Sequence, residues 1–103
     1  MRDAKLRRLA AKGWRTGTAQ QFLGLTDTEA VYIELRLKLS EGLRARRQQQ
    51  RLTQHEVAKA LRSSQSRIAK MESGDPSVSL DLLVRSLLRL GVSRRELARL
   101  IER

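Results

Sequence analysis

Four consecutive polar side chains, Ser64, Gln65, Ser66 and Arg67, precede the first apolar residue of a short segment, and Lys70 follows one helical turn later. A glutamine amide carries a donor beside an acceptor and can pair with N6 and N7 of adenine, while a serine hydroxyl can donate or accept. Arginine and lysine can reach guanine or a phosphate. Because these side chains are free to bind a partner rather than fill a core, they are candidates for a hydrogen-bonding recognition surface.

The residues needed for other chemistry are missing from the sequence. It has no cysteine and a single histidine, His55, which we expect to be an exposed helix residue rather than a ligand or a base. We find no metal-ligand cluster, no nucleophile beside a base and no phosphate-binding glycine loop. The sequence therefore predicts neither an enzyme nor a metal or cofactor site.

Two short helices are predicted around the polar run, over residues 53–61 and 64–73. Thr53 and Glu56 have the spacing of a capping box, and Ser64 is the N-cap residue of the second helix. Gly74 ends that helix. Two short helices joined by about three residues have the helix-turn-helix arrangement.

This arrangement places demands on particular positions. A small residue, Ala58, lies where the helices cross, and Ile68 packs against it, while Val57 and Leu61 complete the buried face of the first helix. With Ile68 and Met71 holding the second helix, its first turn is free of core packing and can enter the major groove of DNA.

The segment VYIELRLKL, residues 31–39, alternates apolar and polar residues as a strand does. Thr26 and Glu29 form a capping box just before it, and most of its residues are good helix formers. We therefore predict one long helix over residues 27–50, with a strand as the alternative.

Two further helices are predicted after the motif. Ser79 caps the first, which Gly91 ends, and Ser93 with Glu96 forms a capping box for the second. The expected fold is all-α, with one long helix and four short ones. The apolar residues of the last helix are candidates for core packing or for dimer contacts: Leu97, Leu100 and Ile101.

The net charge of +11 points to a polyanionic partner, of which nucleic acid, an anionic membrane surface and an acidic protein all fit. An arginine-rich composition can also reflect genome bias. No apolar run is long enough for a membrane span, and the basic N-terminus lacks the apolar stretch of a secretory signal. The lack of disulfides fits a reducing compartment, and we expect a cytoplasmic, nucleoid-associated protein without a membrane partner.

The segment LTQHEVAKALRSSQSRIAKMESGD, residues 52–75, resembles the helix-turn-helix core of the XRE/Cro family of prokaryotic DNA-binding proteins. The resemblance implies a five-helix, lambda-repressor-like fold over residues 33–101 and double-stranded DNA as the partner. It implies that Gln54 contacts the DNA backbone and braces the base-reading residue. It also implies that Gln65 and Ser66 read bases.

The family pattern also assigns roles to several arginines. Arg47 and Glu72 match a pair that forms a structural salt bridge. Arg62 stands where the family often has glycine, in a turn that favours positive φ, and it is a candidate phosphate contact. Apart from the family pattern, three further arginines are candidates for phosphate contacts or, as an equal alternative for each, for solvated surface charges: Arg44, Arg46 and Arg51.

Residues 1–26 are predicted to form a partly helical arm ahead of the domain at 27–103. The arm holds Trp14 and Phe22, with Leu23 and Leu25 beside them, and these residues either cover the domain's own core or dock a partner. GWRTGTAQQFLGLT, residues 13–26, followed by a long helix, is similar to HigA-like antitoxins, which pair with an RNA-cleaving toxin. Such a toxin is itself expected to be basic, which counts against strong electrostatic docking.

The preferred hypothesis is a sequence-specific, homodimeric repressor, with an autoregulating antitoxin as its specific form. The alternatives are a stand-alone repressor without a toxin and a module that binds nucleic acid or protein without reading sequence. The last would bind any polyanion equally and leaves Gln65 and Ser66 unexplained.

Overall fold

The computed structural model describes residue 24 and residues 26–103, and the chain divides into two compact units, residues 1–35 and 36–103. Most of the predicted arm, including its proposed docking residues Trp14, Phe22, Leu23 and Leu25, lies outside the described residues. The described part holds five helices and no strand. The elements are α3 (Asp27–Gln49), α4 (Gln54–Ala60), α5 (Gln65–Ser73), α6 (Leu80–Arg89) and α7 (Arg94–Glu102). The all-α prediction is confirmed.

The alternating segment 31–39 is helical, so the helix interpretation is confirmed and the strand alternative is wrong. The hydroxyl of Thr26 accepts a hydrogen bond of 3.1 Å from the backbone N–H of Glu29, which satisfies one of the free amides at the helix start. Leu39 and Leu43, four residues apart, are 2% and 0% exposed. Spacing of four, rather than two, therefore decides which of the apolar residues enter the core.

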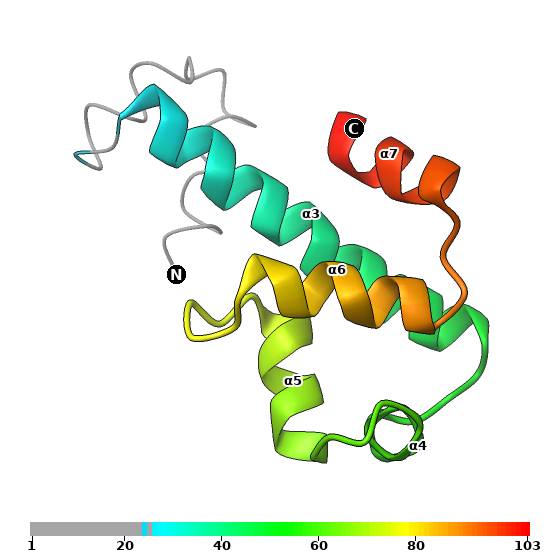
Figure 1. Cartoon of the computed structure of the whole chain (residues 1–103). Coiled ribbons are helices and arrows are strands. Elements are labelled where there is room, and N and C mark those ends of the chain that lie inside the picture. The colour runs from blue at the N-terminus through cyan, green and yellow to red at the C-terminus, as the bar shows by residue number, and fades with distance from the viewer. Residues whose placement is uncertain (1–23, 25) are drawn as a thin grey trace. The chain divides into compact units, whose positions relative to one another are not determined.

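One core holds residues 36–103 together. The crossing of α4 and α5 is built as expected, with Ala58 3% and Ile68 0% exposed. In Figure 1, α4 is seen nearly end-on and α5 from the side, so the two helices cross steeply, and they lie on one side of α6 while α7 lies on the other. The buried cluster consists of Leu39, Leu43, Val57, Ala58, Leu61, Ile68, Met71, Val78, Leu83, Leu87, Leu90 and Val92.

Helices α3, α4 and α6 end in the same backbone motif, in which a residue with positive φ follows the last turn. Arg51 (φ 58°) occupies this position after α3, Arg62 (φ 54°) after α4 and Gly91 (φ 88°) after α6. The paired bonds of the motif are present after α4, from Arg62 N to Lys59 O at 3.2 Å and from Ser63 N to Ala58 O at 2.8 Å. Arg62 thus keeps the left-handed conformation in which the family pattern favours glycine.

The last helix lies closely against α3. A Cβ atom added to Gly42 would lie 2.6 Å from a methyl carbon of Leu100, so the glycine lets the Leu100 side chain lie directly on α3, and a larger residue would require Leu100 to shift. Leu97 and Leu100 pack against the core, which matches the core-packing alternative for these residues, whereas Ile101 is 43% exposed.

Candidate nucleic-acid interface

The start of α5 presents polar side chains to solvent. The Oγ atom of Ser64 accepts a hydrogen bond of 3.1 Å from the backbone N–H of Arg67, so Ser64 is the N-cap residue of this helix. Ile68 and Met71, 0% and 1% exposed, attach the helix to the core. Gln65, Ser66, Arg67 and Lys70 are all exposed.

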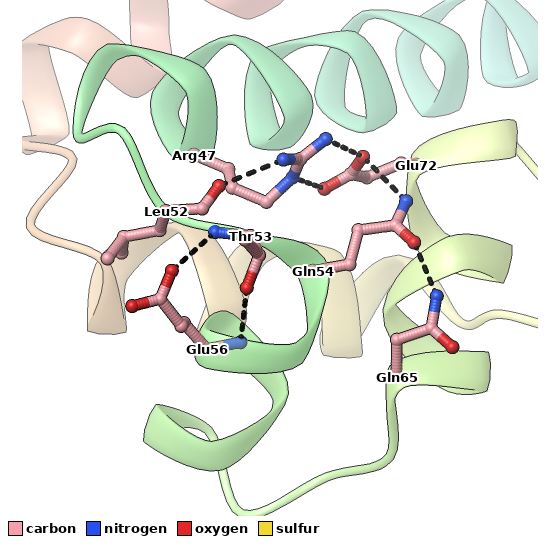
Figure 2. Close-up of polar contacts among 7 residues, drawn as sticks. All are labelled: Arg47, Leu52, Thr53, Gln54, Glu56, Gln65 and Glu72. Carbon is pink, nitrogen blue, oxygen red and sulfur yellow. Dashed lines mark hydrogen bonds and ion pairs between the residues drawn. The ribbon is translucent and has the colours of Figure 1, made fainter.

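A chain of hydrogen bonds connects α3 to the exposed face of α5 (Figure 2). Arg47 on α3 donates from Nε to Oε2 of Glu72 at 2.6 Å and from Nη2 to Oε1 at 3.0 Å. Gln54 on α4 donates from Nε2 to Oε1 of Glu72 at 3.2 Å, and Gln65 donates from Nε2 to Oε1 of Gln54 at 2.7 Å. We call Arg47, Glu72, Gln54 and Gln65 the amide relay.

The inner end of the amide relay is shielded from water. The side chain of Glu72 is 4% exposed and that of Arg47 is 15% exposed. The hydrogen bond with Glu72 raises the pKa of the Arg47 guanidinium. Its Nη1 also donates to the backbone oxygen of Leu52 at 2.9 Å, which fixes the turn before α4. Two-point pairing in a shielded site orders both side chains, so the amide of Gln54 has a rigid anchor.

On the other edge of α5, a polar hollow of about 430 Å³ separates the helix from the loop that follows it. It is lined by Ser64, Ser66, Arg67, Lys70, Ser77, Val78 and Leu82. Two cations, three hydroxyls and an open mouth suit a phosphate group.

The loop beside the hollow is held in place from both sides. Arg36 on α3 donates from Nη2 to the backbone oxygens of Asp75, at 2.9 Å, and of Val78. Oδ1 of Asp75 accepts from the backbone N–H of Ser77 at 2.8 Å. Hydrogen bonds from the hydroxyl and backbone of Ser77 lower the pKa of Asp75, and the charges of Lys70 and Arg36 add to the effect. Asp75 thus stays ionised and keeps the turn that carries Ser77.

The remaining candidate cations have different surroundings. Arg44 is exposed on α3, and Arg51 and Arg62 are exposed on either side of α4. Arg46 instead donates from Nε to Leu90 O at 3.0 Å and from Nη2 to Gly91 O at 3.0 Å. Its guanidinium joins α3 to the turn before α7, which favours a structural role for Arg46 over the predicted phosphate contact.

Two features of this surface are absent from the sequence predictions. Ser77 lines the hollow with Lys70, and the signal that could have found it is the turn-rich SGDPSVS directly after α5. The bond between Gln54 and Glu72 joins the predicted salt bridge to the predicted base reader. No sequence pattern indicates this bond, because it depends on how α4 packs against α5.

A comparison with protein-family models matches residues 43–97, more than half of the chain, to a family described as helix-turn-helix. The chain belongs to this helix-turn-helix family, which is of the XRE type. No curated protein and no solved structure matches the chain.

The family match extends from the last turns of α3 into α7. It includes every residue of the amide relay and every residue that lines the hollow. The protein is a DNA-binding transcriptional regulator of the XRE type. The described residues contain no group of three or more His, Cys, Asp or Glu side chains that could hold a metal ion. Within the same residues, no helix is long and apolar enough to cross a membrane.

Proposed function

We propose that this chain is a sequence-specific repressor that binds double-stranded DNA as a homodimer on the bacterial nucleoid, without catalytic activity. In this proposal Gln65 and Ser66 contact base edges, Gln54 braces Gln65 and Ser64 caps the reading helix. The amide relay carries the proposal, because it fixes a base-reading amide from within the fold. A module that binds DNA only through charge has no use for such a fixed amide.

The cations supply the sequence-independent part of the proposed binding. Arg67 and Lys70 line the hollow beside α5, and Arg51 and Arg62 flank α4. Arg44 is exposed on α3 and completes the set. Each phosphate that these residues neutralise releases condensed counterions, so affinity falls steeply as salt is added. The net charge of +11 agrees with such a surface.

A homodimer is proposed because one reading helix covers only a few base pairs. Two helices about one helical turn of DNA apart give a near-palindromic site and useful affinity. The exposed Ile101, with Leu97 and Leu100 beside it on α7, is the proposed contact between copies.

The specific form that we propose is the autoregulating antitoxin of a toxin–antitoxin pair. The helix-turn-helix match begins at residue 43, and residues 1–35, a compact unit ahead of the unit at residues 36–103, are an addition to the matched domain. This addition includes an exposed apolar pair, Val31 (51% exposed) and Tyr32 (44% exposed). With Trp14, Phe22, Leu23 and Leu25 of the arm it could offer apolar docking for an RNA-cleaving toxin. Apolar contacts are needed because a basic toxin would be repelled by this chain's charge.

The test is a titration of the purified protein with DNA from upstream of its own gene and with scrambled DNA, at ~150 mM salt, where non-specific binding is weak. We expect a preference of roughly a hundredfold or more for the upstream DNA, reduced by Gln65→Ala. Gln49→Ala is the matched control, because Gln49 is an exposed glutamine that borders α7 instead of α5.

Equal, weak binding to both DNAs, unchanged by Gln65→Ala, would refute the base-reading role. Co-purification with the product of a neighbouring gene, lost when Trp14 and Phe22 are replaced by alanine, would support the antitoxin form. If the protein represses its own gene and no product of a neighbouring gene binds it, the chain is a stand-alone repressor.

A further inference from the structure

The amide relay has a direction, which its acidic member determines. Both carboxylate oxygens of Glu72 accept hydrogen bonds from the Arg47 guanidinium, which can only donate. Neither oxygen therefore has a proton to offer to Gln54. The amide of Gln54 must turn its Nε2 toward Glu72, as it does at 3.2 Å.

The orientation of Gln54 then determines that of Gln65. With Nε2 of Gln54 directed at Glu72, its Oε1 faces Gln65 and can only accept. Gln65 must in turn direct Nε2 toward Gln54, and the bond is short, 2.7 Å. Oε1 of Gln65 remains as an acceptor, next to the second N–H of the same amide (Figure 2).

We infer that Glu72 is a positioning residue that selects, through Gln54, which bases Gln65 can read. This inference deepens the proposed function and rests on it. An outward acceptor beside one N–H matches adenine, whose N6 donates and whose N7 accepts, and it accepts from cytosine N4. Guanine presents two acceptors, O6 and N7, and finds only one N–H in this orientation, whereas the single acceptor of thymine, O4, can take that N–H in either orientation.

Pairing with both acceptors of guanine would require reversal of the amides. Reversing Gln65 alone directs its Oε1 at Oε1 of Gln54 and loses the bond between them. Reversing both amides directs Oε1 of Gln54 at the carboxylate and loses the charge-assisted bond instead. Loss of one bond to a charged group corresponds to roughly a tenfold to hundredfold change in affinity.

A variant without the charged pair should change which bases the protein binds, rather than only weaken its binding to DNA. In Arg47→Met/Glu72→Met, both orientations of Gln54 and Gln65 become accessible. Affinity for the adenine site should fall by only about twofold, because half of the molecules still have the correct orientation. Affinity for guanine at that position should rise roughly tenfold, since reversal no longer loses a bond to a charge.

The double variant is chosen because replacing a shielded ion pair by apolar side chains of similar size is often neutral for stability, whereas removing one partner is not. Arg47→Lys is the matched control, since it disturbs the pair but keeps the carboxylate. Circular dichroism and thermal melting establish that each variant is folded before binding is measured.

The experiment starts with selection of bound duplexes from a randomised DNA pool by the full chain and by Gln65→Ala. The position whose preference disappears in Gln65→Ala is the one that Gln65 reads. Four duplexes that differ only at that base pair are then titrated with the wild type, the double variant and Arg47→Lys. We expect the wild type and Arg47→Lys to favour adenine or cytosine, and the double variant to bind the guanine duplex more tightly than the wild type does.

Three results would overturn the inference: a wild-type preference for guanine, unchanged discrimination in the double variant, or parallel weakening on all four duplexes, as a merely structural role predicts. If the wild type selects a sequence in which no position depends on Gln65, this inference fails while a DNA-reading function stands. If it selects no sequence, the proposed function fails as well.

Discussion

Two turns of this molecule have the same construction and differ in the type of residue that adopts the left-handed conformation. Arg51–Glu56 joins α3 to α4, and Gly91–Glu96 joins α6 to α7. Each begins with a left-handed residue and continues with an apolar residue and an N-cap hydroxyl. Each ends with a capping-box glutamate, Glu56 or Glu96, whose carboxylate accepts from the backbone of the N-cap residue.

The left-handed residue is an arginine in the first turn and a glycine in the second. For a residue with a side chain, this conformation costs roughly 1–2 kcal/mol. The other left-handed arginine, Arg62, follows α4, so both strained arginines flank the first helix of the DNA-binding motif. Strained residues of this kind cluster at functional sites. The glycine in the second turn favours stability, whereas Arg51 and Arg62 accept strain and each place a cation beside a helix of the helix-turn-helix motif.

The largest expected effect comes from placing an arginine in the second turn. Gly91→Arg should lower the free energy of unfolding by about 2 kcal/mol, from backbone strain and from displacement of Arg46. A Cβ at residue 91 would lie 3.0 Å from Nη2 of Arg46, which donates to Gly91 O. Urea denaturation measures the loss, and a variant as stable as the wild type would contradict the argument.

Replacing a left-handed arginine by glycine should change the free energy of unfolding in the opposite direction and by a smaller amount. Arg51→Gly and Arg62→Gly should each stabilise the fold by about 0.5–1 kcal/mol, because relief of strain exceeds the added entropy of the unfolded chain. Each should also weaken DNA binding and reduce the salt slope of log affinity by about 0.9.

Arg95→Ala, at an exposed position on α7, is the control for simple loss of charge and should leave the salt slope unchanged. A glycine variant that is more stable and binds DNA with the same salt slope would show that Arg51 and Arg62 touch no phosphate.

The N-cap hydroxyls of the two turns offer a third test. Thr53→Ala and Ser93→Ala should each lower stability by about 1 kcal/mol, because each hydroxyl accepts a 3.1 Å bond from the backbone of its glutamate. Only Thr53→Ala should also weaken DNA binding, since Gln54 of the amide relay is the first residue of α4. If both variants bind DNA equally well, the N-cap at Thr53 does not contribute to positioning the amide relay.

The smallest expected effect is the loss of folding stability at acidic pH. Hydrogen bonds from the backbone and then the hydroxyl of Thr53 lower the pKa of Glu56 from its ordinary value of 4.5, and Ser93 does the same for Glu96. A lowered pKa in the folded state gives stability that is complete above pH 4.5 and disappears as pH falls through the lowered pKa. Glu56→Gln and Glu96→Gln should each lose less stability on acidification than the wild type. Denaturation curves at neutral and acidic pH test this.

Much of this fold could be predicted because its helix boundaries depend on local chemistry. Thr53, Ser64 and Ser93 sit at N-caps as expected, and Gly74 and Gly91 follow helix ends. The alternation over residues 31–39 suggested a strand, but a cap at Thr26 and helix-forming side chains indicated the correct structure.

The remaining features depend on the packing of elements that are distant in sequence. Arg46 and Arg47 are adjacent residues of the same type, but their side chains point about 100° apart around the axis of α3. Arg46 therefore meets the carbonyls of Leu90 and Gly91, and Arg47 meets Glu72. The hollow beside α5 is likewise bordered by the loop that carries Ser77, which Arg36 on α3 holds through the backbone oxygen of Asp75.

The contact between Gly42 and Leu100 has a consequence for the order of folding. A glycine inside a helix costs about 1 kcal/mol relative to alanine, so α3 is weakest where α7 crosses it. Helices α4 and α5 are neighbours in the chain and can pair early, whereas α7 must close a long loop before Leu100 covers Gly42. The centre of α3 should therefore gain protection from amide hydrogen exchange only when α7 docks, and the two segments should open together as one cooperative unit.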